Sequence, residues 1–148
     1  MGSYTVTLEI EGKEPLELRR PTPYIAIDLI QWWKRTIQAA DSQAVNETDT
    51  DTILESVKHR EALINAAWGR VIGRVLTNPP DVTGDSPEEY GLGVWLALHD
   101  QGWSVPELEA LGEACIEVLK HEMQAPTREA VKYRLDFGAA RRDLPTSH

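Results

Sequence analysis

The amino-acid sequence predicts an α+β protein that is predominantly α-helical, with an N-terminal β-hairpin packed on a bundle of about five helices. Near the start of the chain, apolar and polar residues alternate, which is typical of a half-buried strand. From about residue 24 the apolar residues recur every three or four positions, which indicates helices. Serine- and proline-containing signals then mark further helix starts. The length of 148 residues fits one ordinary domain.

The hairpin is predicted from two short alternating segments. The first has its apolar residues at every second position, at Tyr4, Val6, Leu8 and Ile10. Residues 11–15 contain Gly and Pro and are turn material, and residues 16–19 alternate again. An isolated two-stranded hairpin is marginal in water, so its apolar face needs a cover. The helix expected over residues 24–40 has a wide apolar stripe and is the expected cover, so residues 1–40 predict a ββα unit.

The second helix is expected to begin at Thr52, after a polar loop over residues 41–51. Thr52 and Glu55 fit a capping box, in which each side chain bonds a free backbone N–H at the helix start. The helix should run to about Leu76, because the Asn-Pro-Pro sequence of residues 78–80 cannot continue it.

The third and fourth helices are predicted by two serine start signals. Ser86 with Glu89 opens the third helix, and Ser104 with Glu107 opens the fourth. The third helix is so apolar that it should lie at the centre of the bundle, and it should end at Gly102.

A short fifth helix is expected after Pro126. Thr127 would cap it, and its apolar residues would be Val131, Leu135 and Phe137. The helical body then covers residues 52–137 and completes a single domain over residues 1–137. Residues 138–148 are expected to form a flexible C-terminal tail.

The charge balance excludes some classes of partner. The sequence holds 15 Lys and Arg against 24 Asp and Glu, a net charge of −9. Such a field disfavours binding to nucleic acid and to anionic membranes. No apolar stretch approaches the ~20 residues that cross a bilayer, and no signal peptide is evident at the start. We therefore expect a cytoplasmic protein that binds neither nucleic acid nor membranes.

Residues that could carry catalysis are scattered. The four histidines are His59, His99, His121 and His148, and none has a second ligand one helical turn away. The acidic residues of the 41–55 region lack the glycine of a calcium loop. Cys115, the single cysteine, falls on an apolar helix stripe, where it should act as a small hydrophobe. We expect no catalytic residue, no metal and no cofactor, so the protein should not be an enzyme but should bind other proteins.

A line of small residues on the second helix is the first candidate interaction feature. Its members follow at spacings of four, three and four, and they are Ala62, Ala66, Gly69 and Gly73. Each glycine inside a helix costs about 1 kcal/mol relative to alanine. Close approach of another helix would offset that cost. We favour an intramolecular crossing, and the alternative is a groove for a partner helix or for a second copy of the chain.

Two further features could contact a partner. One glutamate per turn lies on the outer face of the fourth helix, at Glu109, Glu113 and Glu117. These residues predict either a solvated face or a contact for a basic partner. Trp32 and Trp33 are neighbours and diverge by about 100° on a helix. One of them could therefore be an exposed binding anchor, unless the hairpin and later helices cover both.

The hairpin, the Leu-Arg-Arg-Pro-Thr sequence at residues 18–22 and the helix after it resemble the N-terminal pattern of bacteriophage tail assembly chaperones. The segment from Tyr90-Gly91-Leu92-Gly93 through Glu107-Leu108 is similar to their helical body. The resemblance implies a non-enzymatic protein in the host cytoplasm that shields the tape-measure protein, helps recruit tail-tube subunits and is absent from the finished particle. The family has no catalytic residues to carry over.

If the chain is such a chaperone, its small-residue line and its tryptophans make Trp32, Trp33, Gly69 and Gly73 the expected contact residues for the client. Two other functions stay open. The protein could be a structural phage component, such as a head–tail connector or a tail-completion protein. It could also be an acidic inhibitor that blocks a basic host protein through Glu109, Glu113 and Glu117.

Overall fold

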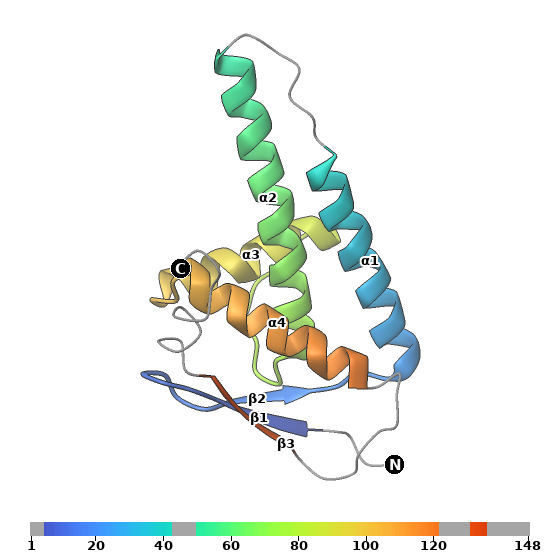
Figure 1. Cartoon of the computed structure of the whole chain (residues 1–148), viewed down its shortest axis with the longest axis vertical. Coiled ribbons are helices and arrows are strands. Elements are labelled where there is room, and N and C mark those ends of the chain that lie inside the picture. Colours follow the sequence, from blue (N-terminus) through green and yellow to red (C-terminus); the bar gives the residue numbers. More distant parts are fainter. Residues whose placement is uncertain (1–4, 43–49, 122–130, 136–148) are drawn as a thin grey trace, which may run out of the picture.

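The structure is a computed structural model that describes residues 5–42, 50–121 and 131–135. Its elements are, in chain order, β1 (Thr5–Ile10), β2 (Leu16–Arg19), α1 (Pro23–Asp41), α2 (Thr50–Val75), α3 (Pro87–Asp100), α4 (Val105–His121) and β3 (Val131–Leu135). Figure 1 shows the sheet at one end of the molecule and α1 and α2 rising away from it. The predicted class, α+β and mainly helical with an N-terminal antiparallel hairpin, is confirmed, with four helices in the described residues instead of five.

The sheet has three strands in the order β2-β1-β3. β1 and β2 form the predicted antiparallel hairpin, with Val6 opposite Leu18. β3 pairs with the other edge of β1 in the parallel direction, from Val6 opposite Val131 to Ile10 opposite Leu135. The beginning and the end of the described chain therefore meet in one sheet.

The prediction of a fifth helix was wrong, because Val131 and Leu135 belong to strand β3. The expected cap Thr127, the residue Phe137 and the expected tail lie outside the described residues. A short apolar run cannot be assigned to helix or strand by its periodicity alone. The edge of β1 that β2 does not cover favours a strand at residues 131–135. The backbone N–H and C=O groups of that edge need hydrogen-bond partners, and a parallel strand supplies them.

Helix α4 lies over the sheet, where the sequence had suggested α1. The apolar face of the hairpin, with Val6, Leu8 and Leu18 fully buried, belongs to the same core as Leu108 and Leu119 of α4. Figure 1 shows α4 crossing above the strands while α1 stands beside them. An apolar hairpin face accepts any apolar helix of suitable length, so sequence order did not identify the cover.

Helix α2 is the central helix, although the sequence had suggested α3. α2 packs against α1, α3 and α4, and Val71, Ile72 and Val75 on it are fully buried. α3 packs mainly against α2 and leaves Leu96 55% exposed. High apolar content shows that a helix is buried on one side but does not show how many neighbours it has.

Both serine caps are confirmed. The backbone N–H of Glu89 donates to Ser86 Oγ at 3.1 Å, and that of Glu107 donates to Ser104 Oγ at 3.3 Å. The Ser104 N–H donates in return to Glu107 Oε1 at 2.8 Å, which completes a capping box. The expected cap at Thr52 is wrong, because α2 begins at Thr50 and Thr52 lies inside its first turn.

Lys13 in the β1–β2 turn joins the hairpin to the α3–α4 turn. Its Nζ lies 3.7 Å from Glu107 Oε1, donates to the Gly102 carbonyl at 3.3 Å and sits 4.8 Å from the centre of the Trp103 ring. Gly102 has φ +103°, a conformation that favours glycine and ends α3 before the chain turns into α4. Among the helices that the structure describes, none combines the length and apolar character needed to cross a membrane.

Candidate functional site: a tryptophan surface on helices α1 and α2

The line of small residues on α2 lies at an intramolecular helix crossing. A Cβ added to Gly69 would collide with the carbonyl oxygen of Gly91 in α3, and one added to Gly91 would collide with the carbonyl of Ala66. A Cβ on Gly73 would come within 2.5 Å of the Tyr90 hydroxyl. Ala66, Gly69 and Gly73 are buried and Ala62 is half-buried. Since α3 occupies this line, Gly69 and Gly73 are not available as a groove for another chain.

A second close approach joins α2 to α4 through Trp68 and Gly112. A Cβ on Gly112 would collide with the Trp68 ring, so the glycine makes room for the indole. Gly112 is buried and Trp68 is half-buried. Sequence reasoning did not connect these two residues. The only available signal was a glycine in the interior of an apolar helix, which indicates close packing without naming the neighbour.

Trp32 and Trp33 contact different parts of α2, and both are half-buried. The rings of Trp33 and Trp68 meet edge to face, with centroids 5.2 Å apart and planes at 61°, a favourable geometry for aromatic pairs. Trp32 lies on the other flank of α1, where the Arg70 guanidinium sits 4.5 Å from the centre of its ring. Neither tryptophan is a fully exposed anchor, and Trp33 is the one that joins a larger apolar area.

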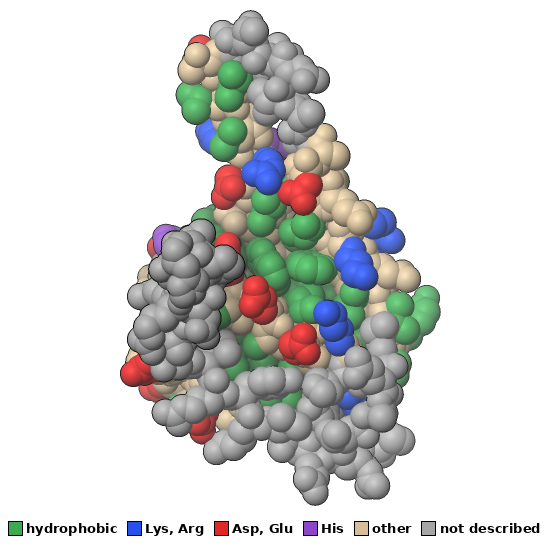
Figure 2. Space-filling model, in the orientation of Figure 1, with side chains coloured by type: hydrophobic (Ala, Val, Ile, Leu, Met, Phe, Trp, Pro, Cys, Tyr) green, Lys and Arg blue, Asp and Glu red, His purple; other side chains and the backbone are tan. Residues whose placement is uncertain are grey.

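This apolar area, here named the tryptophan surface, consists of Trp33 and Ile37 of α1 and Ile64 and Trp68 of α2. Residues four apart on a helix share a face, and the Trp33–Trp68 contact brings the two pairs together. All four side chains are half-buried. Figure 2 shows hydrophobic side chains gathered between α1 and α2 above α4, with charged side chains around them.

One edge of the tryptophan surface is acidic. Glu61 of α2 and Glu109 and Glu113 of α4 are exposed, and the charges of Glu61 and Glu113 act on Glu109 where α4 packs with Gly112 against Trp68. Partial desolvation raises the pKa of Glu109, and the charges of Glu113 and Glu61 raise it further. Glu117, the third member of the predicted row, is exposed one turn farther along α4. The fold thus adds Glu61 from another helix to a row that the sequence had placed on α4 alone.

The indole N–H of Trp33 is buried, and no hydrogen-bond acceptor meets it within the described part of the chain. A buried donor without an acceptor costs about 1–3 kcal/mol. We therefore expect Trp33→Phe, which keeps an aromatic ring against Trp68 and removes the donor, to change the free energy of unfolding by less than about 1 kcal/mol. Trp33→Ala should lower it by about 3 kcal/mol, near the low end for large core truncations. Urea unfolding followed by circular dichroism measures both, and equal losses would contradict this account.

The upper part of α2 carries apolar residues outside the packed body. Leu54 is 56% exposed and Val57 is 46% exposed. In Figure 1 this part of α2 extends above α3 and α4, with α1 alongside. The ion pair between Arg60 Nη2 and Asp41 Oδ1, at 3.2 Å, ties the two helices together at this level.

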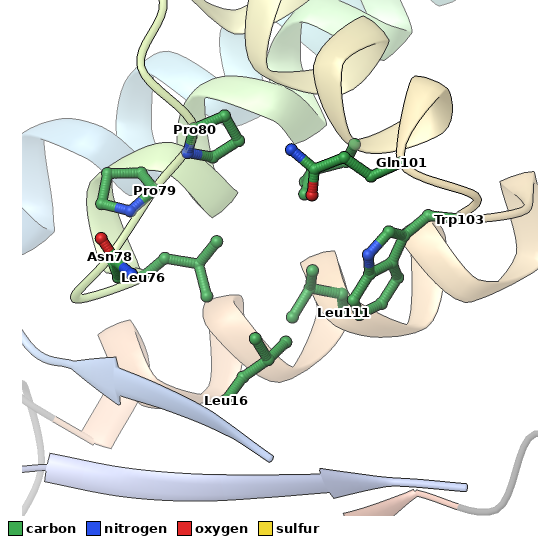
Figure 3. A pocket seen from close by; sticks show the side chains of 9 residues that line it. Leu16, Leu76, Asn78, Pro79, Pro80, Gln101, Trp103 and Leu111 are labelled. Carbon is green, nitrogen blue, oxygen red and sulfur yellow. The ribbon is translucent and has the colours of Figure 1, made fainter. Parts of the chain in front are cut away.

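A small pocket lies at the opposite end, between the sheet and the helix turns. Its volume is about 170 Å³. Figure 3 shows Asn78, Pro79 and Pro80 on one side, Gln101 and Trp103 on the other, and Leu16, Leu76 and Leu111 below. The pocket is smaller than the ~300–1,000 Å³ of usual ligand sites, and no ionisable side chain lines it. It therefore offers no acid–base group for catalysis.

In the described part of the chain, His99 and Cys115 lie in separate surroundings, a helix turn and the core. His99 Nδ1 lies 2.9 Å from the Trp103 carbonyl oxygen, where it supports the α3–α4 turn. Cys115 is fully buried in the core, and this burial raises the pKa of its thiol. Within residues 5–42, 50–121 and 131–135, no group of three His, Cys, Asp or Glu side chains could hold a metal ion.

Comparison of the chain with models of protein families, with curated proteins and with solved structures found no match of any of the three kinds.

Proposed function

We propose that this chain is a non-enzymatic assembly chaperone of the phage tail type, which shields apolar segments of a tape-measure protein and helps recruit tail-tube subunits. The observation that carries the proposal is the tryptophan surface, where the half-buried Trp33 and Trp68 of two neighbouring helices lie together. Aromatic residues are enriched where proteins bind one another. The tape-measure protein is proposed as the client because the hairpin-to-helix pattern at residues 18–22 resembles that of tail assembly chaperones.

The shape of the surface favours a protein client over a small molecule. Its apolar residues lie along two neighbouring helices that pack against each other, and exposed Leu54 and Val57 extend it on α2. A partner helix laid along two helices can bury such a stripe, as in helix-in-groove recognition. Tape-measure proteins are long and aggregation-prone in the family that the chain resembles, so shielding would keep such a client soluble until the tail assembles.

The role is tested by affinity capture with the tagged chain from a lysate of phage-producing cells, followed by mass spectrometry of the bound proteins and of purified particles. We expect the tape-measure protein to be captured and kept soluble, and we expect this chain to be missing from purified particles. Its presence in particles at a fixed ratio would show a structural component instead. Capture of one host protein with no tail protein would indicate an inhibitor.

The site is tested by Ile64→Gln, which replaces an apolar side chain of the tryptophan surface with a polar one and so removes an apolar contact. We expect client binding to weaken about tenfold, since about 1.4 kcal/mol lies just below the ~1.5–3 kcal/mol for fully burying an aliphatic side chain and Ile64 is already half-buried. Leu96→Gln is the matched control, because Leu96 is an exposed apolar residue on α3, outside this surface. Equal effects of the two substitutions on the affinity, measured by calorimetry, would remove the assignment of the site.

A further inference from the structure

Helix α2 carries a row of mostly apolar residues, here named the seam, in which Leu54 and Val57 are exposed. The seam consists of residues spaced three, four, three and four apart, which are Leu54, Val57, Glu61, Ile64 and Trp68. This alternation keeps side chains in line along a helix, as at the contact positions of a coiled coil. From Leu54 to Trp68 the seam rises about 21 Å, at ~1.5 Å per residue. That length suits a partner helix of about four turns.

Helix α1 runs along one side of this seam and α4 borders its lower end, where Gly112 meets Trp68, and the two sides differ in charge. Lys34 of α1 is exposed next to Trp33. On the other side, Glu109 and Glu113 of α4 stand beside the only charged member of the seam, Glu61. Figure 2 shows acidic side chains on the α4 side of the hydrophobic area and basic side chains on the α1 side. The charge around the seam is therefore negative on the side of α4 and positive on the side of α1.

We propose that the seam and the tryptophan surface bind an amphipathic helix of a partner protein, and that this helix carries Lys or Arg residues along the flank that faces α4. Its apolar stripe would cover Val57, Ile64 and Trp68. Its cations would lie among three carboxylates that repel one another in the free protein, so binding relieves this repulsion. The proposal deepens the proposed function, on which it rests, by stating the chemistry of the client segment.

A second copy of the chain fits this surface poorly. A two-fold contact brings the same patch of both copies together, so the Glu61, Glu109 and Glu113 edges would lie in one interface. Like charges juxtaposed across an interface are costly, and each chain also carries a net charge of −9. A heterologous helix with basic residues avoids this repulsion.

Two synthetic 18-residue peptides test the proposal against the full chain by titration calorimetry. Both peptides have the same leucine stripe at heptad contact positions, and one has lysines on its flanks where the other has glutamates. We expect the lysine peptide to bind at least about tenfold more tightly at low salt, and we expect this preference to shrink in 0.5 M NaCl because salt screens exposed charges. Equal binding of the two peptides would overturn the proposal.

A pair of charge-reversed variants locates the effect. Glu61→Lys with Glu109→Lys should weaken binding of the lysine peptide about tenfold or more and improve binding of the glutamate peptide. Glu11→Lys with Glu14→Lys changes the net charge equally at exposed positions of the β1–β2 turn and should leave both affinities within about twofold. Equal losses in the two double variants would mean that net charge alone attracts the peptide, which would overturn the assignment. Circular dichroism confirms that each variant is folded.

The same variants separate this proposal from the proposed function. Capture of the tape-measure protein that is unaffected by Glu61→Lys with Glu109→Lys leaves the chaperone role intact and overturns the basic-flank assignment. Preference for the lysine peptide without capture of any tail protein supports the assignment and removes the chaperone role. Self-association that Ile64→Gln abolishes, measured by sedimentation, would show that a second copy covers the seam and would overturn the proposal.

Discussion

Gly91→Ala should lower the free energy of unfolding by about 3 kcal/mol or more, and Gly69→Ala should have a similar effect. Each added Cβ would collide with a backbone carbonyl of the facing helix, that of Ala66 for Gly91 and that of Gly91 for Gly69. No side-chain rotation relieves a clash with backbone, so α2 and α3 must separate, at a cost near or above the usual 1–3 kcal/mol of overpacking. Urea denaturation followed by circular dichroism measures the loss.

Gly93→Ala is the control for this prediction, because Gly93 lies two residues farther along α3. The nearest atom to its added Cβ belongs to Val82, at 3.4 Å, which is ordinary contact. Alanine is favoured over glycine inside a helix by about 1 kcal/mol, so this variant should be as stable as the parent chain or slightly more stable. A Gly91→Ala variant as stable as Gly93→Ala would contradict the close crossing of α2 and α3.

Raising the pH above about 8.5 should destabilise the parent chain more than a Cys115→Ala variant. Burial raises the pKa of the Cys115 thiol, whereas the thiol of the unfolded chain ionises near pH ~8.5. Above that pH the folded state holds a proton that the unfolded state has lost, so stability falls by about 1.4 kcal/mol per pH unit. By pH 10 the stability of the parent chain relative to the variant should have fallen by roughly 2 kcal/mol.

Urea unfolding of both proteins between pH 7 and pH 10 measures this difference. Groups common to both chains titrate in both. The change with pH in the difference between their free energies of unfolding therefore comes from Cys115. At pH 7 the variant should be the less stable protein, because it leaves a cavity in a fully buried position. Parallel stability curves across this pH range would mean that the thiol is accessible in the folded protein, which contradicts its burial.

The local sequence predicted the elements whose signals are local. Alternation at Val6 and Leu8 predicted β1, and Ser86 and Ser104 predicted the starts of α3 and α4, because a cap depends on residues within one turn. The signal failed at residues 131–135, where five residues are too few to separate a helical period from a strand. It also failed at Thr52, where the helix begins two residues earlier than the capping pattern indicated.

The candidate site was predicted only in pieces. Trp33 and Glu109 were recognised as residues that could meet a partner, but Trp68, Ile64 and Glu61 were not connected with them. The connection depends on the packing of α1 and α4 against α2, and contacts between distant helices have no signature in either segment alone. The line through Gly69 and Gly73 shows the same limit, because its spacing indicated a close helix contact without naming α3 as the neighbour.

The sequence by itself determined the acidic charge, the fold class and the close helix contact along Gly69 and Gly73, because these depend on composition and on periods of a few residues. The tertiary structure decided that β3 completes the sheet, that α4 covers it and that α2 lies at the centre. It also decided that Glu61, Glu109 and Glu113 share one edge of the tryptophan surface. The physical reason is that each apolar face can be buried by several alternative neighbours, and only packing of the whole chain selects among them.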